Sequence, residues 1–396
     1  VHAHTPFAAP ARVARALAPP PCGAPTPSGM CHDRDAHPPP ASPAPRARAC
    51  RRAARWRSWG VARGDRVLLC YLPGIEFITA FWACLRVGAI AVPVYPPDPN
   101  KLAMGVKKLG LVRASCDARL CLTERTLNRM RQLTSMTHSW PADLRWERSD
   151  VVTAAQAARA QREFDALGTE VVAPDADEVA FLQFTSGSTG DPKGVMLTFA
   201  NLWHNINDVY LPAQRQQFAV RDLPLCDGAT SDVAASHVES DGARVVGVSW
   251  LPQFHDTGLV LCITAPFVGG YRMINYSPLT FLKSPLGWLE TLSRYRAHWS
   301  AAPDFAYELC TRRLRGNALD GVDLHSVRLF ACGAGERCRP PQLERFARTF
   351  ERACSLRTDV WIPNYGLAEV RQRAQWLAAR RALEISDHPP RSSPRA

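Results

Sequence analysis

One short segment combines glycines, hydroxyl residues and a lysine in a way that suits a polyphosphate. Residues 185–194 read TSGSTGDPKG and directly follow the apolar run 179–184. Three glycines allow positive φ angles, so that successive N–H groups can converge on an anion. The hydroxyls add donors, and Lys193 adds a compact positive charge. The residues that we expect to bind phosphate are Thr185, Ser186, Gly187, Ser188, Thr189, Gly190 and Lys193.

Two other interpretations of this segment can be weighed from its residues. It is not a Walker A loop, because the pattern GxxxxGK[ST] is absent and the lysine follows Pro192. A Ser- and Gly-rich hairpin turn is the remaining alternative. Turns rarely combine so many small and hydroxyl residues with a terminal lysine, and we therefore favour a phosphate-binding loop.

The elements that must position this loop read as a mixture of strands and helices. Residues 66–70 and 89–95 are short apolar runs, and 74–87 has apolar residues at helical spacing followed by Gly88. A strand, a helix and a strand within about 30 residues form a βαβ unit, which implies a parallel sheet. Further strands are expected at 118–122, 179–184, 245–251 and 327–332, and further helices at 154–167, 201–210, 286–299 and 342–353.

The charge distribution argues against a nucleic-acid-binding core. The net charge is +12 over 396 residues, but the excess lies in 1–63 and 371–396, and the residues between are close to neutral. A nucleic-acid-binding domain would carry its basic patch on the folded part. No apolar run is long enough to span a membrane. The thirteen cysteines lack CxxC pairs, which indicates reduced thiols in an intracellular, cytoplasmic protein.

Composition divides the chain into three parts, the second of which contains an unusual segment. Residues 1–58 are rich in Pro, Ala and Arg and are expected to be a disordered leader, with an organelle transit peptide or a wrongly predicted first exon as alternatives. Residues 59–370 are expected to fold. Residues 211–246 hold few large apolar side chains and are expected to be a disordered insertion. Residues 371–396 form an Arg-rich tail.

Several segments, in order, resemble the motifs of the adenylate-forming superfamily. These are GDRV at 64–67, LPGIEF at 72–77, GAIAVPVYPP at 88–97, FLQFTSGSTGDPKGVMLT at 181–198, SWLPQFHDTG at 249–258, APDFAYELC at 302–310 and NYGLAE at 364–369. The forms at 249–258 and 302–310 are similar to the fatty acyl-AMP ligase branch in particular. The resemblance implies an α/β fold, the large N-terminal domain of such an enzyme, with two βαβ-rich subdomains whose mixed sheets are flanked by helices.

The resemblance also implies a reaction and a role for each motif. In this family a carboxylate attacks the α-phosphate of ATP, an acyl-adenylate forms and pyrophosphate leaves. Residues 185–194 would hold the leaving phosphates, and Thr185 and Glu369 would hold Mg²⁺. His255 would lie near the reacting carboxylate, with a structural histidine as the alternative, and the catalytic residues would be His255, Lys193 and Glu369. The remaining nucleotide contacts would come from Gly333, Ala334, Tyr365, Gly366 and Leu367.

The implied substrate is a medium- or long-chain fatty acid. The acceptor would be the phosphopantetheine of an acyl carrier protein, often of a polyketide synthase. A fatty acyl-CoA ligase fragment and a non-catalytic nucleotide-binding remnant are the alternatives. Trp250, Phe254, Phe305 and Tyr307 are candidates for the wall of an acyl pocket, although core packing explains them nearly as well.

The sequence departs from the family pattern in two places. Residues 333–338 read GAGERC where the family usually has Gly-Ala-Glu-Pro, and Cys332 stands where an asparagine is more usual, which puts the role of Glu336 in doubt. No motif of the family's small C-terminal domain, with its reactive-site lysine, occurs in 370–396. We therefore expect an incomplete ligase with impaired adenylation.

Overall fold

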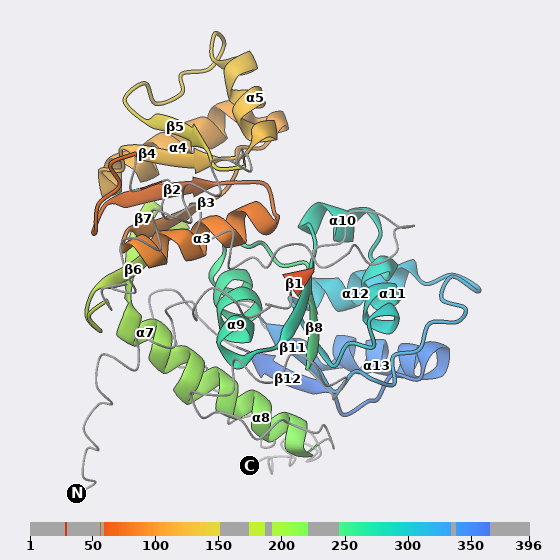
Figure 1. The fold of residues 1–396 in the computed structure, drawn as a ribbon. Helices are drawn as coiled ribbons and strands as arrows, with labels where there is room; N and C mark the ends of the chain where they lie inside the picture. The colour runs from red at the N-terminus through yellow and green to blue at the C-terminus, as the bar shows by residue number, and fades with distance from the viewer. Residues whose placement is uncertain are drawn as a thin grey trace, which may run out of the picture.

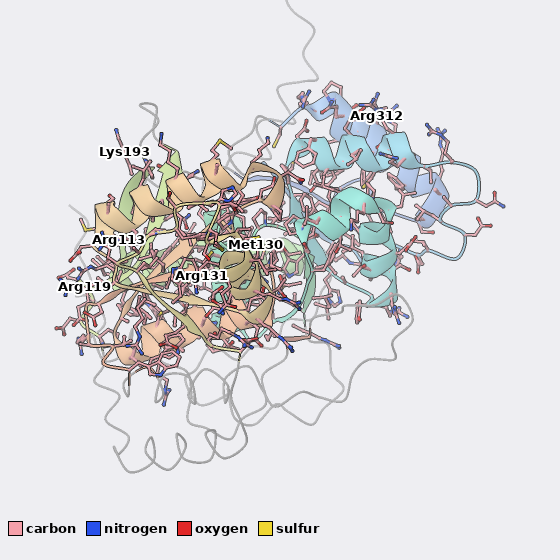
Figure 2. The ribbon with its side chains drawn as sticks, turned by 90° about the horizontal axis from the view of Figure 1, so that it is seen from above. Arg113, Arg119, Met130, Arg131, Lys193 and Arg312 are labelled. Carbon is pink, nitrogen blue, oxygen red and sulfur yellow. The ribbon has the colours of Figure 1, made fainter. Side chains whose placement is uncertain are left out.

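The computed structural model contains two neighbouring sheets with helices packed against them (Figure 1). It describes residues 28–29, 56, 59–150, 174–186, 192–220, 245–333 and 338–364. Each sheet has six described strands, in the orders β5-β4-β2-β3-β6-β7 and β1-β9-β8-β10-β11-β12. Seen from above, Arg113, Arg131 and Lys193 mark the first sheet and its helices, and Arg312 marks the helices of the second (Figure 2).

The first sheet is parallel except at one edge. Its strands are β2 (Arg66–Cys70), β3 (Ile90–Val94), β4 (Leu120–Thr123), β5 (Arg145–Arg148), β6 (Val179–Ser186) and β7 (Pro192–Thr198). All neighbours pair in parallel apart from β6 and β7, which form an antiparallel hairpin. The expected βαβ unit is confirmed, because α3 (Ile75–Val87) links the parallel strands β2 and β3.

Both faces of the first sheet are covered at its centre, where the strands β2, β3 and β4 are apolar on both sides. In β2, Val67 and Leu69 belong to the larger core together with α3, whereas Leu68 and Cys70 face a smaller core. Successive side chains of a strand point to opposite faces, so a strand covered on both sides reads as a continuous apolar run. The smaller core receives the apolar side of α4 (Leu102–Cys116) and Leu127 from α5 (Arg125–Thr134).

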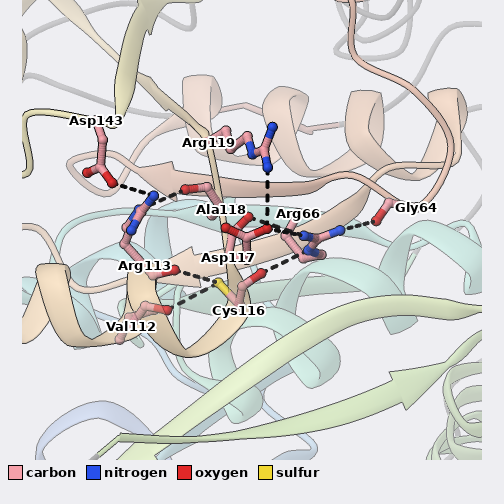
Figure 3. Close-up of polar contacts among 9 residues, drawn as sticks. All are labelled: Gly64, Arg66, Val112, Arg113, Cys116, Asp117, Ala118, Arg119 and Asp143. Atoms are coloured by element: carbon pink, nitrogen blue, oxygen red, sulfur yellow. Dashed lines mark hydrogen bonds and ion pairs between the residues drawn. The ribbon is translucent and has the colours of Figure 1, made fainter.

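A polar network fastens the C-terminal end of α4 to the start of β2 (Figure 3). The Arg66 guanidinium donates to the Cys116 carbonyl at 2.8 Å and forms an ion pair with Asp117 at 3.3 Å. Asp117 ends α4 with a left-handed conformation at φ 46°. The guanidinium therefore satisfies a carbonyl group that the helix leaves without an internal partner.

The second sheet is parallel throughout its described strands. These are β1 (Ser28–Gly29), β8 (Val246–Ser249), β9 (Arg272–Asn275), β10 (Trp299–Ala302), β11 (Leu329–Gly333) and β12 (Trp361–Asn364). Its helices are α10 (Pro278–Lys283), α11 (Leu286–Arg294), α12 (Asp304–Arg313) and α13 (Pro340–Cys354). Aromatic rings fill the space between sheet and helices; those of Trp288 and Phe330 lie 5.5 Å apart, and those of Tyr307 and Phe346 lie 5.2 Å apart. The expected α/β fold with two sheets is thus confirmed. The first sheet is mixed as expected, whereas the second is parallel in its described strands.

Two helical runs follow strands β7 and β8. The first consists of α7 (Phe199–Trp203), the π-helix η2 (His204–Tyr210) and α8 (Leu211–Val220). Thr198 caps the first run, because its hydroxyl accepts from the Asn201 N–H in a capping box. The second run consists of the π-helix η3 (Thr257–Thr264) and α9 (Ala265–Gly269). In the part of the chain that the structure describes, no helix is long and apolar enough to cross a membrane.

Three expectations from the sequence need correction. Residues 211–220, expected to be disordered, form α8, which continues the preceding helical run; residues 221–244 lie outside the described part. The helix expected at 286–299 ends at Arg294, because Arg296 takes φ 45° and Trp299 begins β10. A further helix, expected at 154–167, lies outside the described part and is therefore not among these corrections.

The third correction concerns the leader. Ser28 and Gly29 pair with Met273 and Ile274 of β9 through their backbones, and Trp56 is fully buried in the larger core. Composition describes side chains, and it therefore does not reveal that a short backbone segment can pair with a sheet edge. The other residues of 1–58 lie outside the described part, as does the expected tail at 371–396.

Candidate functional site

The predicted phosphate loop connects the two strands of the β6–β7 hairpin. Thr185 lies opposite Lys193, and Ser186 lies opposite Pro192. Lys193 is exposed on β7, on the side of the molecule formed by the first sheet (Figure 2). The predicted residues between these strands, namely Gly187, Ser188, Thr189 and Gly190, lie outside the described part of the chain. The hairpin therefore holds both ends of the loop in a fixed register.

Close contact within the hairpin requires a glycine after the lysine. A Cβ atom at Gly194 would lie 2.9 Å from the Phe184 ring, which stands opposite it. Real Cβ atoms essentially never approach a heavy atom so closely. The glycine lets the Phe184 ring cover the backbone next to Lys193.

A second group of predicted residues lies at the carboxyl edge of the second sheet. Gly333 ends β11 opposite Asn364, which ends β12. The φ angle of Gly333 is 132°, a conformation that residues with a side chain rarely adopt. Ligands of parallel α/β sheets bind at the carboxyl ends of the strands. The predicted nucleotide residues that follow these two strands, Ala334, Tyr365, Gly366, Leu367 and Glu369, lie outside the described part.

His255 belongs to a tight turn that follows β8 at the same edge of this sheet. Its N–H donates to the Pro252 carbonyl at 3.1 Å, and its own carbonyl accepts from Leu259 N–H at 2.8 Å. Gly258 packs against the turn so closely that a Cβ atom would lie 2.0 Å from the Pro252 oxygen. The turn therefore fixes the backbone of His255, whose side chain is 58% exposed.

The imidazole of His255 forms an ion pair with the neighbouring carboxylate of Asp256. The hydrogen bond that His255 donates to Asp256 raises the pKa of His255, and burial opposes this only in part. Burial acts to raise the pKa of Asp256, but the hydrogen bond and charge of His255 and the donors of Thr257 outweigh it, so that this pKa is lowered. The pair favours a protonated imidazole beside an ionised carboxylate.

Two buried glutamines connect the His255 turn with its surroundings. Neither was predicted from the sequence. Gln183 on β6, two residues before Thr185, donates to the Phe254 carbonyl at 3.2 Å. Gln253 accepts from the Gly74 N–H at 2.7 Å, at the start of α3. The structure thus brings the His255 turn against the strand that leads into the phosphate loop. A polar residue inside the apolar run VAFLQF is the signal that could have revealed Gln183.

The candidate acyl-pocket residues separate into two groups. Trp250 and Tyr307 are buried in the larger core, where Trp250 stacks on Phe281 at 3.9 Å and the Tyr307 hydroxyl donates to the Ala331 carbonyl at 3.2 Å. Phe254 packs edge-on against Tyr95, and Phe305 is 40% exposed. Packing within the protein accounts for the first group.

The predicted magnesium ligands are hard oxygen donors, a hydroxyl from Thr185 and a carboxylate from Glu369. This donor chemistry fits Mg²⁺, which prefers oxygen ligands and commonly uses one or two carboxylates together with phosphates. Thr185 is described in β6, and Glu369 lies outside the described part. Among the described residues, no group of three His, Cys, Asp or Glu side chains could hold a metal ion.

Solved structures share this architecture. A fatty acyl-adenylate ligase from Legionella pneumophila, solved with acyl adenylate and pyrophosphate, matches with a TM-score of 0.70 at 28% identity, over 91% of this chain and 55% of that one. The two sheets are therefore those of the N-terminal domain of adenylate-forming enzymes. A family model described as "AMP-binding enzyme" matches residues 46–379. The chain belongs to this AMP-binding enzyme family.

Curated relatives match over much of this chain. The medium-chain-fatty-acid–[acyl-carrier-protein] ligase JamA of Moorena producens is 35% identical over 312 residues, 78% of this chain and 46% of the relative. The long-chain-fatty-acid–AMP ligase FadD23 of Mycobacterium tuberculosis is 31% identical over 309 residues, again 78% of this chain and 47% of the relative. The chain spans about half the length of the curated relatives that it matches.

Proposed function

We propose that this protein binds ATP and a medium- or long-chain fatty acid and joins them as a fatty acyl-AMP. The observation that carries the proposal is the contact between Gln183 and the Phe254 carbonyl. It joins the strand of the phosphate loop to the His255 turn, which follows the carboxyl end of β8. The names of JamA and FadD23, a fatty-acid–carrier-protein ligase and a fatty-acid–AMP ligase, support the substrate class.

In this proposal the two sheets supply different parts of the site. The hydroxyls and N–H groups of 185–190, together with Lys193, bind the β- and γ-phosphates and stabilise the leaving pyrophosphate. Gly333, Ala334, Tyr365, Gly366 and Leu367 bind the adenosine part. Such fixed donors accelerate phosphoryl chemistry mainly by positioning and by neutralising charge.

In this proposal His255 and Glu369 have separate roles. Protonated His255, held by Asp256, donates a hydrogen bond to the fatty-acid carboxylate or to the α-phosphate. Thr185 and Glu369 hold Mg²⁺, which when bound neutralises phosphate charge. The acceptor that we propose is the phosphopantetheine arm of an acyl carrier protein, in line with the name of JamA.

Two measurements on the 396-residue chain test this function. One is the binding of a hydrolysis-resistant acyl-adenylate analogue, followed by calorimetry. The other is ATP–pyrophosphate exchange that depends on lauric or longer acids. We expect Lys193→Ala to lower exchange by about 10²–10³-fold, the usual effect of removing one preorganised donor. Lys283→Ala, an exposed lysine on α10, is the matched control and should leave exchange unchanged.

The outcomes separate the alternatives. Analogue binding without exchange would contradict the activation reaction and favour a non-catalytic nucleotide-binding protein. Equal exchange in the Lys193→Ala and Lys283→Ala variants would contradict the proposed role of the loop. Transfer of the acyl group to coenzyme A in preference to a carrier protein would favour the CoA ligase.

A further inference from the structure

The side chain of Gln253 binds the start of a helix that belongs to the other sheet. Its Oε1 accepts from the Gly74 N–H at 2.7 Å. Gly74 is the N-cap of α3 and has no side chain with which to cap it. Because the first N–H groups of a helix have no partner within the helix, an oxygen from elsewhere can take the place of a cap. Gln253 is only 2% exposed, so this bond is shielded from water.

The next residue, Phe254, is held through both its backbone and its ring. Its carbonyl accepts from the Gln183 Nε2 at 3.2 Å, and its ring lies edge-on to Tyr95 with the ring centroids 4.9 Å apart. Gln183 lies in β6, and Tyr95 directly follows β3, which is the neighbouring strand of the first sheet. Two adjacent strands therefore hold one residue of the His255 turn.

The partners of the two glutamines determine which end of each amide faces them. The Gly74 N–H is a donor, so Gln253 must present its oxygen, and the Phe254 carbonyl is an acceptor, so Gln183 must present its nitrogen. The opposite ends, Gln183 Oε1 and Gln253 Nε2, are buried and have no hydrogen-bond partner among the described residues. Such groups are rare in native proteins and each calls for an explanation. A role at a functional site is one such explanation.

These contacts also involve two motifs that the proposed chemistry leaves without a role. Gly74 belongs to LPGIEF and Tyr95 to GAIAVPVYPP. Both motifs contact residues 253–254, as does the strand that leads into the phosphate loop. Three segments of the first sheet and its helices therefore converge on the two residues directly before His255.

We propose that Gln183 and Gln253 are positioning residues that fix His255 relative to the strand of the phosphate loop. The inference rests on the proposed function, in which His255 donates to the reacting carboxylate or to the α-phosphate. Neither glutamine touches the reacting groups. They act through His255, because they bind residues 253–254 to the half of the molecule that carries Thr185. A displacement of about 1 Å at a reacting group can lower a rate about 10²-fold.

A double-mutant cycle on the 396-residue chain tests whether Gln183 acts through His255. ATP–pyrophosphate exchange with lauric acid is measured for Gln183→Leu, for His255→Ala and for the two together. We expect Gln183→Leu to lower kcat about 10–100-fold with little change in the KM for ATP, and to have no further effect when His255 is already alanine. Gln253→Leu should behave in the same way. Gln214→Leu changes another buried glutamine, on α8, and is the matched control that should leave pyrophosphate exchange unchanged.

Amide hydrogen exchange tests the same contacts without enzyme activity. The His255 N–H donates to the Pro252 carbonyl, and the Leu259 N–H donates to the His255 carbonyl. Both amides should exchange faster in Gln183→Leu and Gln253→Leu than in the unsubstituted chain. In Gln214→Leu they should exchange at the unsubstituted rate.

Gln183→Glu is the conservative variant. A protonated glutamic acid can still donate to the Phe254 carbonyl, whereas an ionised one has no proton to donate. Burial raises the pKa of such a carboxyl group. We therefore expect kcat of this variant, relative to the unsubstituted chain at the same pH, to rise as the pH falls.

The outcomes distinguish the positioning role from the proposed function. The positioning role would be overturned if Gln183→Leu lowered kcat equally with and without His255, which is the result of a purely structural role. It would also be overturned if both leucine variants left amide exchange in the turn unchanged. A lack of pyrophosphate exchange in the unsubstituted chain is a different result, because it contradicts the proposed function and the positioning role together.

Discussion

At the scale of single residues, the His255–Asp256 pair makes a prediction about pH. The pKa of His255 is raised, so its contribution to stability is complete below its ordinary value of 6.5 and is lost as the pH rises through the raised pKa. The pKa of Asp256 is lowered, so its contribution is complete above 3.8 and is lost as the pH falls through the lowered pKa. The pair is therefore strongest between these two ordinary values.

Asp256→Asn tests this assignment because asparagine can still accept from the Thr257 N–H. We expect the pKa of His255 to fall toward 6.5, measured by NMR titration of the imidazole. Asp208→Asn is the control, since Asp208 forms a similar but exposed pair with His204 at 2.7 Å. An unchanged titration of His255 in the Asp256→Asn variant would show that the pair does not set this pKa.

Gly258 makes a second prediction at this scale. A Cβ atom there would meet the carbonyl oxygen and carbon of Pro252 at 2.0 and 2.8 Å, and backbone atoms cannot move aside as a flexible side chain can. We expect Gly258→Ala to lower the free energy of unfolding by about 1–3 kcal/mol. Gly110 lies within α4, and a Cβ atom there would meet only Pro141, at 3.9 Å, outside its own helix; Gly110→Ala should therefore add about 0.5–1 kcal/mol. Urea denaturation of the two variants distinguishes these effects, and equal shifts would contradict the steric argument.

At the scale of elements, two ion pairs connect α12 with α13. One joins Asp304 to Arg339, the N-cap residue of α13, and the other joins Glu308 to Arg345 within α13; they differ mainly in burial. Asp304 is fully buried where it meets Arg339, whereas Glu308 and Arg345 are 21% and 54% exposed. Arg339→Ala leaves a buried carboxylate with one donor fewer, and we expect a loss of about 1–3 kcal/mol in the free energy of unfolding. Arg345→Ala should cost less than about 1 kcal/mol. Thermal unfolding of the two variants gives the comparison, which fails if Arg345→Ala is the more damaging.

The same scale explains which elements the sequence could predict. The β2–α3–β3 unit was predictable because its strands are continuously apolar and Gly88, at φ 75°, ends its helix. The end of α11 was not, because Arg296 turns the chain with a positive φ that no glycine announces. The helix α8 was missed because its polar sequence LPAQRQQFAV has little of the apolar periodicity on which helix prediction depends.

At the scale of the whole molecule, the sequence could predict only the parts of the candidate site that are contiguous in the chain. The loop at 185–194 and the motif around His255 carry their signal in neighbouring residues. The glutamines do not, because Gln183 acts on a carbonyl 71 positions away and Gln253 on an N–H 179 positions away. Contacts of this kind depend on how the two sheets pack against each other, which a pattern of neighbouring residues in the sequence cannot predict.

The proposed site draws residues from both sheets, and ligand binding should therefore stabilise both. At about 100 times its dissociation constant, an acyl-adenylate analogue should add about 2.7 kcal/mol to the free energy of unfolding. Hydrogen exchange should slow at the ends of β6 and β7, in the His255 turn and at Gly333. The strands β4 and β5, at the opposite edge of the first sheet from β7, provide the internal control and should change least. Protection confined to the second sheet would mean that the β6–β7 loop does not contact the ligand, because a ligand held by that loop must order the strands that carry it.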